Sequence, residues 1–136
     1  MDDCIFCKIV AGQIPCAKLY ENDDMLAFLD IGPVSEGHTL VIHKKHTPSV
    51  AQTDPKLLKD IAEVLPMLAL AVEKAMNADG YNVLCNNGRA AGQVVDHLHF
   101  HIIPRKTGDG VFNRWPAYKY NDEQIGIIAK RIQEYL

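Results

Sequence analysis

The most constraining feature of this sequence is the strict alternation of histidine and apolar residues that begins at His97 and ends at Ile102. Side chains of a β-strand point alternately to its two faces, so the alternation predicts a strand with one apolar face. The three histidines share the other face, with successive side chains about 7 Å apart. Solvated lysine or threonine would serve an ordinary exposed face, so three imidazoles indicate a site for chemistry.

Four further runs of strand-forming residues are expected to join this strand in an antiparallel sheet. The residues Asn22, Asp23 and Asp24 are typical of a turn and connect two of these runs. The predicted strands cover residues 17–21, 25–29, 38–43, 81–86 and 97–103.

A long amphipathic helix is predicted between the third and fourth strands. Asp54 can cap its N-terminus, Pro55 suits its first turn, and apolar residues then recur at steps of three and four. Pro66 interrupts this pattern and predicts a kink or a restart just before it. A second helix is predicted over residues 122–136, and a short one after Cys4.

These elements predict the α+β class: a five-stranded antiparallel sheet with one long helix and a C-terminal helix, in a single domain over residues 1–136. The net charge of −3 argues against binding a nucleic acid polymer. No apolar run approaches the roughly 20 residues that cross a bilayer, and the acidic start does not resemble a signal peptide. We therefore expect a cytoplasmic protein that does not bind membranes.

The histidine strand allows two kinds of chemistry. Two histidines of such a strand can bind zinc, but His97 and His101 lie about 13 Å apart along the strand and cannot easily share one ion. Neutral imidazole is also a nucleophile toward phosphorus. The preceding loop favours phosphate, because its glycines let backbone N–H groups approach closely, and Asn86 and Gln93 add uncharged donors.

The segment from Gly92 to Pro104 resembles the signature of the histidine triad (HIT) family, His-φ-His-φ-His-φ-φ, in which φ is apolar. Segments 4–9, 26–31 and 37–46 resemble the nucleotide-binding branch of that family, in its zinc-containing bacterial type. The resemblance covers about residues 4–105 and implies a single HIT domain.

The resemblance implies a nucleotidyl hydrolase or transferase that cleaves at the α-phosphorus of purine nucleoside phosphoramidates or related conjugates. His99 would attack the phosphorus and form a covalent nucleotidyl intermediate, which water then hydrolyses. His101 and Gln93 would act with it at the phosphoryl oxygens. Relatives often carry a hydroxyl where this chain has Val94, which leaves the preferred leaving group open. A dinucleoside polyphosphate hydrolase and a nucleotide-binding regulatory protein with little catalysis are the alternatives.

The resemblance also implies a pocket for a purine nucleotide. Phe6 and Phe28 would hold the base, and Asp30 would accept hydrogen bonds from the ribose hydroxyls. Ordinary core packing for the two rings and a turn cap for the carboxylate are the alternatives. The implied binding residues are Phe6, Ile9, Phe28, Asp30, Ile31, Asn86, Gly92, Gln93, Val94, His99 and His101.

Two cysteines near the N-terminus, Cys4 and Cys7, have the spacing of half a zinc site. The resemblance implies that His46 and His97 complete a closed set of four ligands for a structural zinc ion. Reduced cysteines without a metal are the alternative.

A homodimer is the expected assembly. The long helix and the sheet edge are apolar enough to pair, and members of the family commonly dimerise through them. The resemblance also places Trp115 near the partner's site, with surface packing as the alternative.

Overall fold

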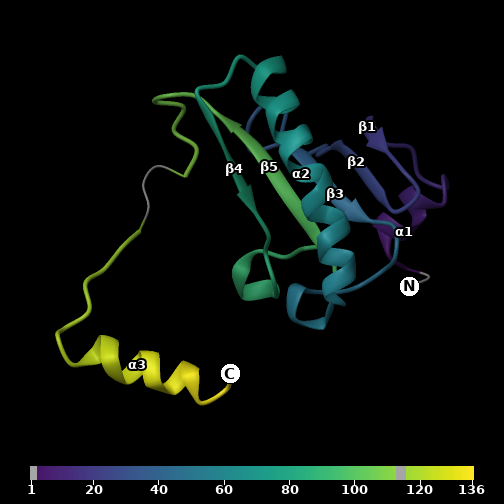
Figure 1. Ribbon diagram of the computed structural model, residues 1–136. Coiled ribbons are helices and arrows are strands. Elements are labelled where there is room, and N and C mark those ends of the chain that lie inside the picture. The colour runs from purple at the N-terminus through teal and green to yellow at the C-terminus, as the bar shows by residue number, and fades with distance from the viewer. Residues whose placement is uncertain (1–2, 113–115) are drawn as a thin grey trace.

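A computed structural model describes residues 3–112 and 116–136, so Trp115 lies outside the described residues. Five antiparallel strands form one sheet in the order β1-β2-β3-β5-β4 (Figure 1). The strands are β1 (Lys18–Glu21), β2 (Met25–Leu29), β3 (Thr39–His43), β4 (Gly80–Leu84) and β5 (His99–Arg105). The helices are α1 (Ile5–Val10), α2 (Pro55–Ala75) and α3 (Gln124–Gln133). The predicted α+β class and five-stranded sheet are confirmed.

The two faces of the sheet carry separate apolar clusters, as the alternation along β5 requires. On one face α2 packs over a cluster that includes Leu98 and Ile102, both almost fully buried (Figure 1). On the other face α1 contributes Phe6 to a cluster with residues of β2 and β3. His99 and His101 alternate with the first set, so they face the side of the sheet on which α1 lies.

The histidine strand begins and ends two residues later than predicted. His97 and Leu98 precede it, and the Leu98 N–H donates to the carbonyl of Thr47 outside the sheet ladder. The strand continues through Pro104, which pairs with Tyr81 of β4, beyond the predicted end at residue 103.

The long helix runs unbroken from Pro55 to Ala75 with Pro66 inside it, so the predicted restart does not occur. Its buried side chains lie on both sides of the proline; they include Ile61, Val64 and Leu68. This packing holds the two halves in register against the sheet and offsets the lost hydrogen bond.

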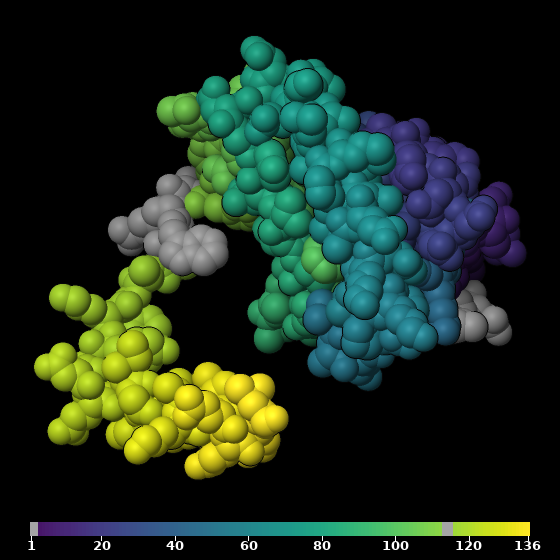
Figure 2. Space-filling model, in the orientation of Figure 1, coloured from purple at the N-terminus to yellow at the C-terminus, as the bar shows by residue number. Residues whose placement is uncertain are grey.

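The C-terminal segment stands apart from the rest of the chain. Figures 1 and 2 show α3 projecting beyond the β4 edge of the sheet, and none of its residues is buried. The segment follows Arg105, the last residue of β5. The Arg105 guanidinium donates two hydrogen bonds of 2.8 and 2.9 Å to the Asp109 carboxylate. Among the described residues, no helix is long and apolar enough to cross a membrane.

Candidate active site

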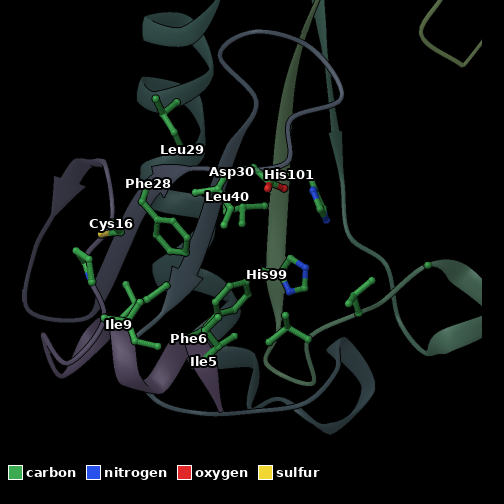
Figure 3. A pocket seen from close by; sticks show the side chains of 16 residues that line it. Ile5, Phe6, Ile9, Cys16, Phe28, Leu29, Asp30, Leu40, His99 and His101 are labelled. Atoms are coloured by element: carbon green, nitrogen blue, oxygen red, sulfur yellow. The ribbon is translucent and has the colours of Figure 1, made fainter. Parts of the chain in front are cut away.

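A pocket of about 380 Å³ opens on the face of the sheet that α1 partly covers. Figure 3 shows Phe6 from α1 and Phe28 from β2 on one side of it, with His99 and His101 along β5. The two phenyl rings meet edge to face, with centroids 5.6 Å apart. Phe6 also meets the His99 ring edge-on at 5.1 Å, so an apolar chamber adjoins the histidine face directly.

His99 has one ring nitrogen in a hydrogen bond, and the other has no hydrogen-bond partner among the described residues. Its Nδ1 lies 2.6 Å from the backbone carbonyl of His97, and a carbonyl only accepts, so Nδ1 carries the proton and donates it. Its Nε2 therefore carries a lone pair. Burial lowers the pKa of His99, which keeps the ring neutral at pH 7. A neutral imidazole with a fixed tautomer is suited to nucleophilic attack.

His101 presents the opposite group, a proton donor, because His38 fixes its tautomer. The Nδ1 of His38 accepts from the Val34 N–H at 3.1 Å, so its Nε2 carries a proton and donates it to Nδ1 of His101 at 2.8 Å. Nε2 of His101 must then carry its own proton. This atom is buried and has no hydrogen-bond partner among the described residues. Burial lowers the pKa of His101 to about 4, so the ring donates as a neutral group.

Asp30 lies next to this pair and also caps a turn. One carboxylate oxygen accepts from the Gly32 N–H at 2.8 Å, and the other lies 3.7 Å from Nε2 of His38. The turn-cap interpretation and the pocket interpretation therefore both describe Asp30, which is one of the pocket's lining residues.

Nine of the eleven residues expected to contact a nucleotide line the pocket; they are Phe6, Ile9, Phe28, Asp30, Ile31, Gly92, Val94, His99 and His101. Asn86 and Gln93 lie outside its lining. Gly92 adopts a left-handed backbone with φ of +92°, and a Cβ there would lie 3.4 Å from Nδ2 of Asn86. The side-chain amide of Asn86 therefore lies next to Gly92.

Gln93 has a different position from the one expected of a phosphate ligand. It is buried, and its amide oxygen accepts from the Gly88 N–H at 2.8 Å. Its amide nitrogen donates to the carbonyls of Pro48 and Val95 at 2.7 and 3.0 Å. These three hydrogen bonds occupy both polar atoms of the Gln93 side chain. In this structure Gln93 therefore positions the loop that borders the pocket.

The structure brings Cys4, Cys7, His46 and His97 together, although His97 lies ninety residues or more from both cysteines in the sequence. Their four candidate ligand atoms all lie within 4.8 Å of one another, so the set could hold a metal ion. Nε2 of His97 donates to the His43 carbonyl at 2.8 Å, which leaves Nδ1 of His97 free to be a ligand. Two thiols and two imidazoles are the donor set that zinc prefers.

Several residues of the candidate site were not predicted from the sequence. Ile5, Cys16, Leu40 and Val95 line the pocket, but their apolar character does not distinguish them from core residues. The role of His38 was not predicted, because nothing in its local sequence shows that β3 pairs with β5 and brings its ring to His101. One signal could have indicated a role for His38, because histidine is uncommon on the buried face of a strand.

Comparison with known proteins identifies relatives along most of the chain. The HIT domain family matches residues 11–108. An adenosine 5'-monophosphoramidase of Schizosaccharomyces pombe is 47% identical over 130 residues, which is 95% of each chain. An adenylylsulfatase of Arabidopsis thaliana is 48% identical over 108 residues, and the match spans 79% of this chain and 55% of that protein.

Solved structures have the same fold. The SMU.412c protein of Streptococcus mutans superposes with a TM-score of 0.94 at 41% identity, over 99% of this chain and 86% of that one. A zinc-bound histidine triad protein of Mycobacterium smegmatis superposes with a TM-score of 0.77 at 36% identity, over 99% of both chains. The histidine triad, the fold and these relatives agree, and the chain belongs to the HIT domain family.

Proposed function

We propose that this protein is a hydrolase of purine nucleoside phosphoramidates or related conjugates, acting through a nucleotidyl–His99 intermediate. The observation that carries the proposal is the neutral His99 ring, with Nδ1 bonded to the His97 carbonyl and Nε2 free beside an apolar pocket. The names of the relatives from S. pombe and A. thaliana, a monophosphoramidase and an adenylylsulfatase, support cleavage next to the α-phosphorus of an adenosine nucleotide.

In the first step Nε2 of His99 forms a bond to the α-phosphorus while the bond from phosphorus to the leaving nitrogen breaks. The nitrogen takes up a proton from solvent and leaves as the amine. In the second step water attacks the phosphorus and gives up a proton to solvent, the bond to Nε2 breaks, and the nucleoside monophosphate is released. Nε2–H of His101, which has no partner among the described residues, would donate to a phosphoryl oxygen in both steps.

The apolar pocket would hold the purine and the ribose. Phe6 and Phe28 offer ring surfaces to the base, while Ile9 and Ile31 border the same space. Asp30 has the one carboxylate of the pocket lining and would accept hydrogen bonds from ribose hydroxyls. Because the Phe6 ring meets the His99 ring, a base bound against Phe6 would bring the nucleotide beside its nucleophile.

We infer that the cluster of Cys4, Cys7, His46 and His97 binds a structural zinc ion. Four protein ligands would leave no position for substrate, so the ion would hold α1 against the histidine strand. His97 is one of the four candidate ligands, and its backbone carbonyl fixes the tautomer of His99. Metal binding and catalysis would therefore share a residue. The two thiols must stay reduced for this role, which agrees with a cytoplasmic location.

Product analysis with three adenosine substrates tests the proposed reaction. We expect the purified protein to convert adenosine 5'-phosphoramidate to AMP with a kcat/KM at least about tenfold above that for diadenosine tetraphosphate, since the P–N bond is the one the site is proposed to cleave. Adenosine 5'-phosphosulfate is the third substrate. Preference for the diadenosine compound would instead favour a dinucleoside polyphosphate hydrolase. Nucleotide binding without turnover of any of the three would favour a regulatory protein.

We also propose a homodimer formed through α2 and the β4 edge. Both elements expose apolar side chains on this side of the molecule: Met67, Leu70, Tyr81 and Val83. We expect the protein to sediment at twice the 15.2 kDa mass of the chain, and Leu70→Glu to shift it toward the monomer, because the charge would be buried in the interface. Leu19→Glu, which changes an exposed leucine on the opposite sheet edge, is the control. A monomeric wild-type protein would contradict the proposal.

A further inference from the structure

A second hollow, of about 370 Å³, adjoins the nucleotide pocket. Ile5, Val94 and Val95 line both spaces, so these three residues form a shared wall. The side chain of Val94 is largely exposed, and it borders both spaces. A ligand that fills the apolar pocket can therefore extend across Val94 into the second hollow.

The chemistry of the proposed reaction says which part of the substrate reaches this hollow. In an in-line displacement the leaving group departs on the side opposite the attacking atom, here Nε2 of His99. The nucleoside fills the apolar pocket, and the unpartnered Nε2–H of His101 marks the position of the phosphate at its edge. A substituent on the leaving nitrogen then needs space outside the apolar pocket, and the second hollow is the space that shares its wall.

The charges around the second hollow favour a cation. Its lining includes Cys4 and His46 of the candidate metal cluster, two carboxylates, Asp3 and Asp96, and one guanidinium, Arg89. Arg89 is already engaged, because it donates to the Val94 carbonyl at 2.6 Å and lies 3.4 Å from the Asp96 carboxylate. Among the described residues of the lining, one negative charge is therefore left over. A zinc ion held by two thiolates would add no net charge beside it.

We propose that the second hollow is the leaving-group subsite, and that it favours leaving amines with a positively charged substituent. This inference rests on the proposed function. An ammonium group at the end of a short alkyl chain would cross Val94 and interact with Asp3, because Asp96 already pairs with Arg89. Arg89 would hold the Val94 carbonyl in place through its 2.6 Å bond, so that the shared wall keeps its shape. A carboxylate in the same place would be repelled by the two acidic side chains.

Three adenosine 5'-phosphoramidates that differ only in the leaving amine test this subsite. The amines are 1,3-diaminopropane, propylamine and β-alanine, which carry a positive, a neutral and a negative end. We expect kcat/KM to fall in that order, with about threefold between neighbours, as is typical of exposed ion pairs. The preference should shrink at high salt, because screening weakens interactions between exposed charges. Equal values, or a preference for β-alanine, would overturn the subsite.

Charge-removing variants assign the preference to its residues. Asp3→Asn should lower the ratio of kcat/KM for diaminopropane over propylamine from about threefold to near one, because it removes the carboxylate that does not pair with Arg89. Asp23→Asn removes an exposed charge from a distant turn and should leave the ratio unchanged. An unchanged ratio in Asp3→Asn, whose carboxylate does not hold the loop, would overturn the assignment. If the protein hydrolyses none of the three compounds, the proposed function itself fails; if it hydrolyses all three equally, only the subsite fails.

Discussion

Replacing His99 with alanine is expected to reduce the turnover of adenosine 5'-phosphoramidate by roughly 10³-fold or more, the scale seen when a covalent nucleophile is removed. No described neighbour can substitute for it. His101 offers a proton at Nε2 rather than a lone pair, and Nε2 of His97 is bonded to the His43 carbonyl. Steady-state kinetics with the purified variant measure the effect on kcat.

The same variant must still fold and bind nucleotide for this result to identify a nucleophile. His99 contributes one hydrogen bond and one edge contact with Phe6, while the apolar pocket keeps its other walls. We therefore expect AMP binding within a few-fold of the wild-type value by calorimetry, and a cooperative thermal transition. A folded variant that retains a tenth or more of the wild-type kcat would contradict the role of His99.

Loss of the proposed metal ion has the second largest expected effect, on stability. A ligand that binds only the native state at 1,000 times its Kd adds about 4 kcal/mol to the free energy of unfolding. For a domain of this size, that corresponds to a fall in Tm of roughly 10 °C when the ion is removed. Cys7→Ser removes one of the four ligands and should lower both the zinc content and Tm. Atomic spectrometry and calorimetry measure the two quantities.

A matched cysteine variant separates metal loss from a general effect of changing a thiol. Cys85 is half-buried and lies outside the four-residue cluster, so Cys85→Ser should keep one zinc ion per chain. Cys7→Ser should also weaken AMP binding, because Cys7 belongs to the helix that carries Phe6. Full zinc content in Cys7→Ser, or no zinc in wild-type protein refolded with the ion, would contradict the metal site.

The parts of this molecule that could be predicted from sequence are those with a local pattern. The alternation around His99 predicted a strand with a histidine face, and the three-and-four spacing predicted α2. The helix ran through Pro66 because packing on both sides of the proline, which the sequence does not display, outweighs the local cost. The start of β5 depended on the contact between Leu98 and Thr47, which is equally non-local.

The candidate site divides in the same way. His99 and His101 were found because their spacing is itself a signal, whereas the link between His38 and His101 exists only once β3 lies beside β5. Gln93 was expected to bind phosphate from its position in the loop, yet its amide bonds to Pro48, a residue of a distant segment. Residue type and spacing therefore predicted which groups are present, and the tertiary structure decided which atoms are free to react.

The most direct test of the account is to trap the covalent intermediate. The protein is mixed with adenosine 5'-phosphoramidate, quenched within milliseconds, and its intact mass and peptide masses are measured. We expect a transient addition of one adenylyl group, located on His99 by fragmentation and absent from the His99→Ala variant. Turnover without any adduct at any quench time, or an adduct on a residue other than His99, would contradict the central claim.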